Sequence, residues 1–101
     1  TAIVDYNKLQ ATGRSDEITG LAPLAAKWRS FGFETREING NQMAEVVQAL
    51  DDLPYAPGRP SAIVAHTVKG KGVSFMEDDL EWHYRPPNDA DLARALREIG
   101  A

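Results

Sequence analysis

Apolar residues along the chain form short runs whose spacing alternates between that of a strand and that of a helix. A first run at residues 2–6 predicts a buried strand, and the polar stretch at 8–20 predicts a loop. Apolar positions then recur at helical intervals, which predicts a helix from about 22 to 31. Pro23 suits its first helical position, and Gly32 suits the position just after its end.

A strand, a turn and a second helix are predicted next. Residues 33–38 alternate imperfectly between two sides, as in a strand. Asn39-Gly40-Asn41 is typical of a turn, and Asn41 would cap a helix over residues 42–52. The apolar positions of this helix share one face: Met43, Val46, Val47 and Leu50.

The strongest strand of the chain is predicted at residues 61–68, after a proline-rich surface loop at 54–60. Its nearly continuous apolar run indicates a central strand that is covered on both faces. A glycine-rich basic turn and an acidic segment follow, and Asn88 then caps a last helix over residues 89–99. The predicted buried stripe of that helix is Leu92, Leu96 and Ile99.

The resulting order, β-α-β-α-β-α, predicts an α/β fold. Three parallel strands would be joined by right-handed helical crossovers. In such sheets ligands bind beyond the carboxyl ends of the strands. This rule selects three segments: Asp5-Tyr6-Asn7-Lys8-Leu9, Asn39-Gly40-Asn41 and Lys69-Gly70-Lys71-Gly72.

Composition narrows the classes of protein that remain. The chain has 101 residues, enough for one domain, of which 43% are hydrophobic and 26% charged. Eleven Lys+Arg against fifteen Asp+Glu give a net charge of -4, which argues against nucleic acid or an anionic membrane as partner. Without cysteine there is no disulfide or thiolate metal site.

No apolar run reaches the ~20 residues of a membrane span and no signal peptide is recognised, so we expect a cytoplasmic protein. The chain opens directly on a strand-like run, which suggests a piece of a longer protein.

Each candidate for chemistry has a plain structural alternative. The Lys69–Gly72 turn offers backbone N–H groups and two amines to a diphosphate or sugar phosphate, or it is a solvated basic turn. The Asn7 amide oxygen suits Mg²⁺ or Ca²⁺, and it equally suits an Asx turn. His83, between two aromatic residues, suits a proton relay or sugar-hydroxyl binding, or belongs to an aromatic cluster that anchors a loop.

Three further features are interpreted as structural. His66 lies inside the strongest strand and could face a ligand at its end, but it is expected to be buried and hydrogen-bonded. The acidic run Glu77-Asp78-Asp79 is expected to be a solvated loop rather than a metal site. Trp28 belongs to a helical stripe and is expected in the core.

Five stretches of the chain carry a family resemblance. They are Ile3-Val4-Asp5-Tyr6-Asn7-Lys8-Leu9-Gln10, Phe31-Gly32-Phe33-Glu34, Ile38-Asn39-Gly40-Asn41, the segment from Ala65 to Val73, and Glu81-Trp82-His83. In this order and spacing they resemble the diphosphate-binding domain of the transketolases, over nearly the whole chain. The resemblance is to the C-terminal part of the thiamine-diphosphate-binding domain, in the N-terminal section of the two-chain bacterial enzymes.

The resemblance implies that residues 1–101 are the C-terminal portion of a doubly wound thiamine-diphosphate-binding domain. It implies that the Asn7 side chain and the Leu9 carbonyl bind Mg²⁺ (or Ca²⁺). It also implies that thiamine diphosphate is bound by Asn7, Leu9, Lys69 and His83. His83 would also face the hydroxyls of the donor sugar and be the catalytic residue of this segment. The implied activity is the transfer of a two-carbon ketol unit between sugar phosphates, a transferase reaction of pentose phosphate metabolism.

The chain also departs from the family pattern. The Gly-Asp-Gly motif, whose Asp is a further metal ligand in the family, is absent, as is the pyrimidine-binding domain with its activating glutamate. The implied partners are therefore the remaining transketolase segments or a C-terminal subunit, in a dimeric assembly, and the chain alone is expected to be inactive. One alternative is another thiamine-diphosphate enzyme, of the deoxyxylulose phosphate synthase or pyruvate dehydrogenase type, which Trp82-His83 disfavours. The other is a non-catalytic α/β interaction module, which the missing Asp favours.

Overall fold

The structure is a computed structural model that describes residues 1–100. Three parallel strands form the centre of the protein. They are β1 (Ala2–Tyr6), β4 (Glu34–Asn39) and β5 (Ser61–His66), in the order β1-β5-β4. β5 lies between the other two and pairs with both along its whole length. The predicted α/β fold with a parallel sheet is confirmed.

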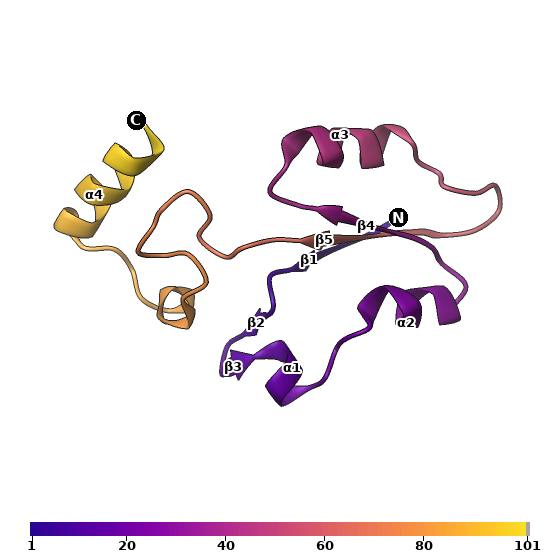
Figure 1. Ribbon diagram of the computed structural model, residues 1–101, viewed down its shortest axis with the longest axis horizontal. Helices are drawn as coiled ribbons and strands as arrows, with labels where there is room; N and C mark the ends of the chain where they lie inside the picture. Colours follow the sequence, from indigo (N-terminus) through magenta and orange to yellow (C-terminus); the bar gives the residue numbers. More distant parts are fainter. Residues whose placement is uncertain (101) are drawn as a thin grey trace.

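A helix covers each face of this sheet (Figure 1). The helix α2 (Leu24–Ser30) packs on β4 and β5, and α3 (Met43–Asp51) packs on β4. The connection from β1 to β4 crosses the sheet in one direction, and the connection from β4 to β5 returns in the other. Two crossovers of the same hand that run in opposite directions place their helices on opposite faces.

The core is built around β5. Five of its six residues are buried, and Ile63 and Val64 are its most completely buried large side chains. On the α2 face, Val64 packs with Tyr6 and Ala25, and Trp28 lies against this cluster. The predictions of a central strand covered on both faces and of Trp28 at the core are therefore confirmed.

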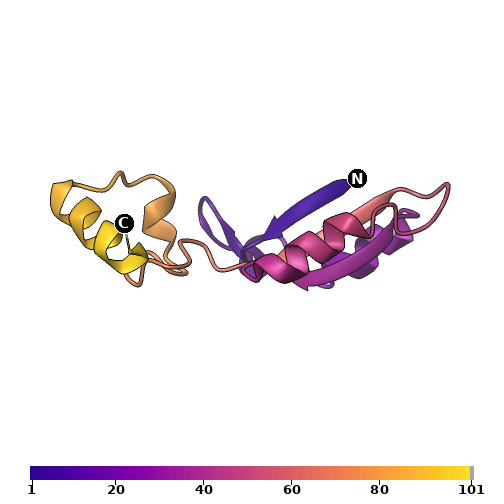
Figure 2. The ribbon, with the colours of Figure 1, turned by 90° about the horizontal axis from the view of Figure 1, so that it is seen from above.

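After β5 the chain leaves the sheet and forms a second, smaller unit beside it (Figures 1 and 2). This unit holds the loop at 67–79, the 3₁₀ helix η1 (Leu80–His83) and the helix α4 (Asp89–Ile99). The whole molecule is long and flat as a result, 51 × 31 × 15 Å. α4 begins where the sequence predicts, because the Asn88 side chain accepts a hydrogen bond from the Asp91 N–H at 2.8 Å.

The expected loop at 8–20 is wrong in part. It contains a two-stranded hairpin, β2 (Leu9–Gln10) with β3 (Gly13–Arg14), and the single-turn helix α1 (Ser15–Ile18). Elements of two to four residues are too short to show a hydrophobic period, so the sequence pattern could not reveal them.

Two helix starts and two strand bounds also differ from the prediction. Pro23 and Gln42 occupy the N-cap positions of α2 and α3, so Pro23 precedes the first helical residue and Asn41 does not cap α3. The Asn41 side chain instead accepts a hydrogen bond from the Val68 N–H at 2.7 Å, which ties the turn after β4 to the end of β5. β5 ends at His66 rather than Val68, and β4 is shifted one residue towards the C-terminus.

The apolar stripe of α4 is exposed, contrary to the prediction. Leu92, Leu96 and Ile99 keep 48%, 39% and 56% of their surface accessible. The apolar face of α3 is similarly open at Met43, Val47 and Leu50. Helical spacing identified the faces correctly, but residues 1–100 supply no further layer to cover them.

Candidate functional site

The three segments selected by the strand-end rule lie at one edge of the sheet. The last residues of the strands, Tyr6, His66 and Asn39, are aligned as register partners across β1, β5 and β4. The residues that follow each strand therefore leave the sheet side by side. Because Asn7, Lys69 and the Asn39-Gly40 turn share this edge, the predicted placement is confirmed.

All four residues expected at the cofactor line a single small pocket at this edge. Its volume is about 100 Å³, and its lining residues are Asn7, Leu9, Gln10, Lys69, Leu80 and His83. One wall comes from the segment after β1, and the other comes from the segment after β5 together with η1. Whole-ligand sites are usually ~300–1,000 Å³, so this pocket alone suits an ion or a phosphate group. Gln10 and Leu80 were missed, because neither residue type signals binding by itself.

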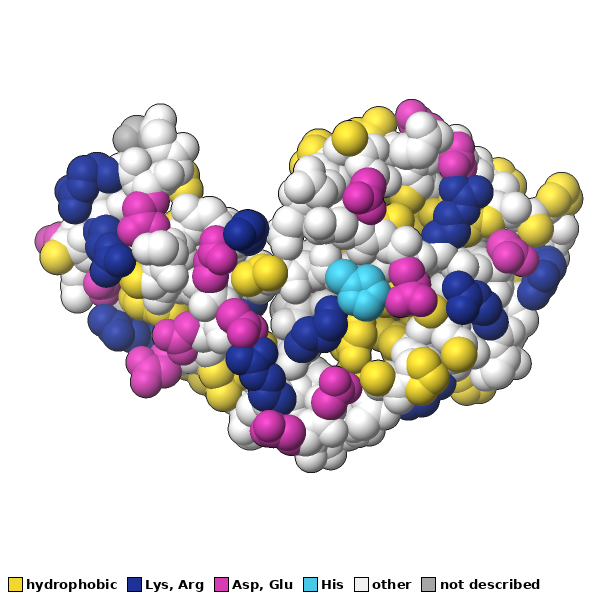
Figure 3. Space-filling model, viewed as in Figure 1, with side chains coloured by type: hydrophobic (Ala, Val, Ile, Leu, Met, Phe, Trp, Pro, Cys, Tyr) yellow, Lys and Arg dark blue, Asp and Glu magenta, His cyan; other side chains and the backbone are white. Residues whose placement is uncertain are grey.

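A larger hollow of about 480 Å³ adjoins the small pocket and shares Asn7 and Lys69 with it. It is also lined by Asp5 and Asn41, and by the glycine-rich turn with Gly70 and Lys71. Figure 3 shows the surface hollowed between the part that carries α4 and the part that carries the sheet. The two hollows together offer a polar, partly basic surface of the size that a cofactor needs.

The Asn7 side chain forms the Asx turn that was the alternative to a metal ligand. Its Oδ1 accepts a hydrogen bond from the Leu9 N–H at 2.9 Å. An amide oxygen has two lone pairs, so this bond leaves one of them for a cation. Among residues 1–100, no three His, Asp or Glu side chains are grouped to hold a metal ion. A cation bound here would have Asn7 and Leu9 as its ligands from this segment, with other ligands from elsewhere.

Lys69 is held at the pocket by both its side chain and its backbone. Its Nζ donates a long hydrogen bond of 3.4 Å to the Trp82 carbonyl, which leaves the amine further donors. Its own carbonyl accepts from the Asp78 N–H at 2.9 Å. The loop that follows β5 therefore folds back on Lys69 and fixes its position.

The acidic run after the turn lies in a loop that solvent reaches, as expected, but each of its members also has a hydrogen-bond or ion-pair partner. Glu77 accepts from the Gly72 N–H at 3.1 Å and pairs with Lys71, and these two contacts lower the pKa of Glu77. Asp78 receives two hydrogen bonds of 2.7 Å from the Arg14 guanidinium, 64 positions earlier in the chain. Asp79 caps η1.

His83 lies in an aromatic cluster and at the pocket at the same time. Its ring packs edge-on against Tyr84, with centroids 4.5 Å apart. Trp82 packs on Phe75 and donates its indole N–H to the Phe75 carbonyl at 2.9 Å, which anchors η1 to the loop. The guanidinium of Arg85 covers the Trp82 ring at 4.6 Å. The anchoring cluster presents His83 to the pocket, so the two interpretations of this segment are compatible.

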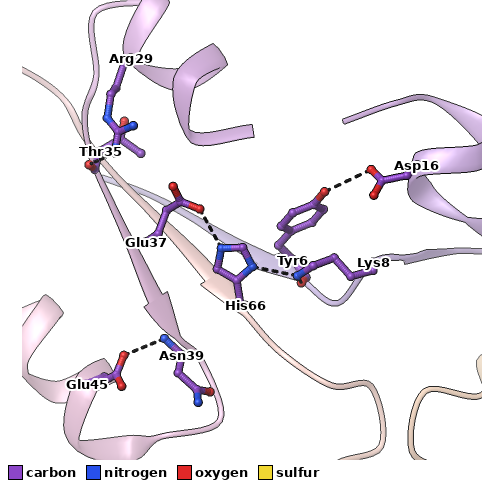
Figure 4. Close-up of polar contacts among 9 residues, drawn as sticks. All are labelled: Tyr6, Lys8, Asp16, Arg29, Thr35, Glu37, Asn39, Glu45 and His66. Carbon is purple, nitrogen blue, oxygen red and sulfur yellow. Dashed lines mark hydrogen bonds and ion pairs between the residues drawn. The ribbon is translucent and has the colours of Figure 1, made fainter. Parts of the chain in front are cut away.

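His66 belongs to a network of side-chain hydrogen bonds that the sequence did not reveal (Figure 4). Its Nε2 lies 2.8 Å from a Glu37 carboxylate oxygen, and its Nδ1 lies 2.9 Å from the Lys8 Nζ. The expected hydrogen bonding is confirmed, but the expected burial is wrong because the His66 side chain is 41% exposed. These residues are 29 and 58 positions from His66, and only the strand register brings them together.

Tyr6 packs beneath the Lys8 amine of this hydrogen-bond network. Its hydroxyl donates to Asp16 at 3.4 Å, and the Lys8 Nζ lies 3.9 Å above its ring. Burial raises the pKa of Tyr6, and the negative charge of Asp16 raises it further. Burial lowers the pKa of the Lys8 amine, while nearby carboxylates oppose that effect.

A parallel sheet with helices on both faces and a pocket at its carboxyl edge is the arrangement of the doubly wound α/β class, in which ligands bind at that edge. The chain is 35% identical over 98 residues to an apulose-4-phosphate transketolase subunit from Phocaeicola vulgatus, covering 97% of this chain and 35% of that protein. It is 45% identical over 98 residues to a 6-deoxy-6-sulfo-D-fructose transketolase subunit from Clostridium sp. (strain MSTE9), covering 97% and 36%. Mouse transketolase is 34% identical over 105 residues, covering 97% of this chain and 15% of that protein.

The resemblance to the transketolases is therefore confirmed: the chain is homologous to transketolases along nearly all of its length. It spans about a third of the bacterial subunits that it matches. No family model matches the chain. Of the helices in residues 1–100, none has the length and apolar character needed to cross a membrane.

Proposed function

We propose that residues 1–101 are the C-terminal portion of a thiamine-diphosphate-binding domain and form part of the cofactor site of a transketolase-type enzyme. The observation that carries this proposal is the convergence of Asn7, Leu9, Lys69 and His83 on one pocket. They come from two segments about 60 positions apart, and the sheet register brings those segments together.

The residues at this edge fit the proposed ligands. An amide oxygen and a backbone carbonyl are hard oxygen donors of the kind that Mg²⁺ and Ca²⁺ accept. Lysine amines and a glycine-rich turn are suited to the charge and close approach of a diphosphate. Thiamine diphosphate, when bound, supplies the carbon–carbon bond chemistry, and the protein supplies position and electrostatics.

Each residue then has a distinct role. Asn7 and Leu9 hold the cation that offsets the charge of the diphosphate, and Lys69 adds a positive charge on the opposite wall. His83 is the catalytic residue of this segment, because its ring nitrogens can exchange hydrogen bonds or a proton with sugar hydroxyls. The aromatic anchor beneath it fixes the direction from which it acts.

The proposed reaction is the transfer of a two-carbon ketol unit between sugars. The names of two relatives specify a sugar phosphate and a sulfo-sugar as their substrates. Both substrates carry a tetrahedral oxyanion, so the class proposed here is a ketose with such a group, with sugar phosphates as the main members. The relatives' designation as subunits supports the remaining transketolase segments, or a C-terminal subunit, as the partner in a dimeric enzyme.

The test replaces Asn7 in the complete subunit, assembled with its partner. Asn7→Ala should weaken the Mg²⁺-dependent affinity for thiamine diphosphate by ~10-fold or more, about 1.4 kcal/mol, because one metal ligand is lost. Calorimetric titration measures this affinity. Gln48→Ala is the matched control, since it removes an amide from α3 that bonds only to Asp52 among the described contacts. An unchanged affinity in Asn7→Ala would reject the assignment.

A further inference from the structure

Lys8 lies between the two residues proposed as metal ligands and has an unusual backbone. Its φ is +67°, in the left-handed region that side chains other than glycine and asparagine seldom adopt. Its carbonyl accepts a hydrogen bond from the Ser15 N–H at 2.9 Å. This conformation turns the chain sharply between Asn7 and Leu9, so that both can face the same pocket.

The Lys8 side chain makes contacts that hold this turn in place. Its Nζ donates to the Tyr6 carbonyl at 2.6 Å and reaches the His66 Nδ1 at 2.9 Å. The first bond closes a loop from Lys8 back to Tyr6, the last residue of β1. The second crosses to the end of β5, so Lys8 links the ends of the neighbouring strands β1 and β5 (Figure 4).

The bonds that His66 makes with Lys8 and Glu37 fix the orientation of its ring. A lysine ammonium can only donate, so the His66 Nδ1 accepts and its Nε2 carries the hydrogen. That Nε2–H points at the Glu37 carboxylate, 2.8 Å away on β4. Three strands are thus joined by one line of hydrogen bonds, Lys8 to His66 to Glu37.

We propose that Lys8 is a positioning residue for the metal site: through His66 and Glu37 it holds Asn7 and Leu9 in the conformation that binds the cation. The inference rests on the proposed function, in which Asn7 and Leu9 are the ligands. Lys8 need not touch the ion or the cofactor for this role. Groups that orient metal ligands commonly contribute ~10-fold or more to metal affinity, because a misplaced ligand must be reordered on binding.

The test titrates Mn²⁺ into the complete subunit with its partner, in the presence of thiamine diphosphate, and counts free Mn²⁺ by electron paramagnetic resonance. Lys8→Met keeps the aliphatic stem and removes the amine, and we expect a ~10-fold weaker affinity. His66→Phe should weaken binding similarly. Since both act through one bond, the double variant should be no weaker than either single variant.

Two further variants separate positioning from other causes. Lys8→Gly removes the amine but relieves the positive φ, so it should still lose affinity if the side chain is the anchor. Lys27→Met is the matched control, because it also removes an amine that bonds to a backbone carbonyl. That carbonyl belongs to Gly20, 2.8 Å away and after α1 in the chain. Thermal melting without metal or cofactor checks that each variant is folded at the temperature of the titration.

The outcomes distinguish this inference from the function on which it rests. Wild-type affinity in Lys8→Gly, or additive losses in the double variant, would overturn the role of Lys8 even if Lys8→Met folds poorly. If Asn7→Ala loses affinity while both Lys8 variants keep it, the metal site stands and the anchor does not. If Asn7→Ala itself binds Mn²⁺ normally, the proposed function fails, and the inference fails with it.

Discussion

Gly70 shows how a single residue shapes the loop that carries Lys69. Its φ is +72°, and a Cβ at this position would lie 2.4 Å from the Met76 carbonyl oxygen. The loop therefore returns over Gly70 with no room for a side chain. The basic turn is a closely packed structure whose geometry depends on that glycine.

Gly70→Ala is expected to destabilise the protein more than a glycine substitution that has only backbone strain. Gly58 provides the comparison, because its φ is +73° and a Cβ there would have nothing within 4 Å. Gly58→Ala should cost ~1–2 kcal/mol for the left-handed backbone alone, and Gly70→Ala should cost more because Met76 must move. Denaturant unfolding of the complete subunit measures both. Equal losses would show that the loop relaxes freely around the new methyl group.

Among the elements, α4 is tied to the loop after β5 chiefly by polar contacts. Glu98 accepts hydrogen bonds from both the backbone N–H and the hydroxyl of Ser74. Arg94 pairs with Glu98 at 3.1 Å and covers the ring of Phe75 at 4.3 Å. The bond from the Ser74 N–H is the main reason that the pKa of Glu98 is lowered.

The docking of α4 should therefore depend on pH in the acid range. Because the folded pKa of Glu98 lies below the ordinary value of 4.5, its contribution is complete above that value and disappears as the pH falls through the lowered pKa. Hydrogen exchange of the α4 amides, corrected for intrinsic rates, should show protection that is progressively lost as the pH falls below 4.5. Glu98→Gln cannot ionise, so its protection should be lower at neutral pH and should change less on acidification. Parent protein that keeps full protection in acid would contradict this role of Glu98.

Elements with a complete local signal could be predicted from the sequence, and elements that depend on distant partners could not. Asn88 and Asp91 cap α4 through bonds within three residues, so its start was placed correctly. The start of α3 was misplaced because Asn41 bonds to Val68, a partner that only the folded sheet supplies. The strand-end rule brought Asn7 and Lys69 to one edge, but it could not show that Lys8 reaches His66, since that contact depends on register and on a positive φ.

Across the whole molecule, apolar surface is exposed on all three larger helices. Phe31 at the end of α2 is 79% exposed, and Met43 on α3 is 71% exposed. Ile3 of β1 is also 62% exposed, on the sheet face opposite α2. Exposed apolar patches of this kind mark surfaces that contact other protein.

The 101-residue chain on its own should therefore be inactive and should associate. With saturating Mg²⁺ and thiamine diphosphate, a coupled transketolase assay should detect no turnover, because the site needs residues beyond Asn7, Leu9, Lys69 and His83 to position both substrates. Sizing chromatography should show oligomers, and Met43→Lys with Val47→Lys should reduce them. Steady turnover from a clean monomer would show that these residues form a complete enzyme.

The paired Arg14 and Asp78 give the small pocket a property that its lining residues do not reveal. Arg14 belongs to the hairpin beside one wall and Asp78 to the loop beside the other, and their side chains are 45% and 50% exposed. Counterions reach such a pair and screen it within ~10 Å at 0.1 M salt, so it contributes little to stability. This contact between the two walls is therefore electrostatic and open to solvent. Rising ionic strength weakens it, while the pairing of β1 with β5 and the Lys8–His66 bond still hold the walls together.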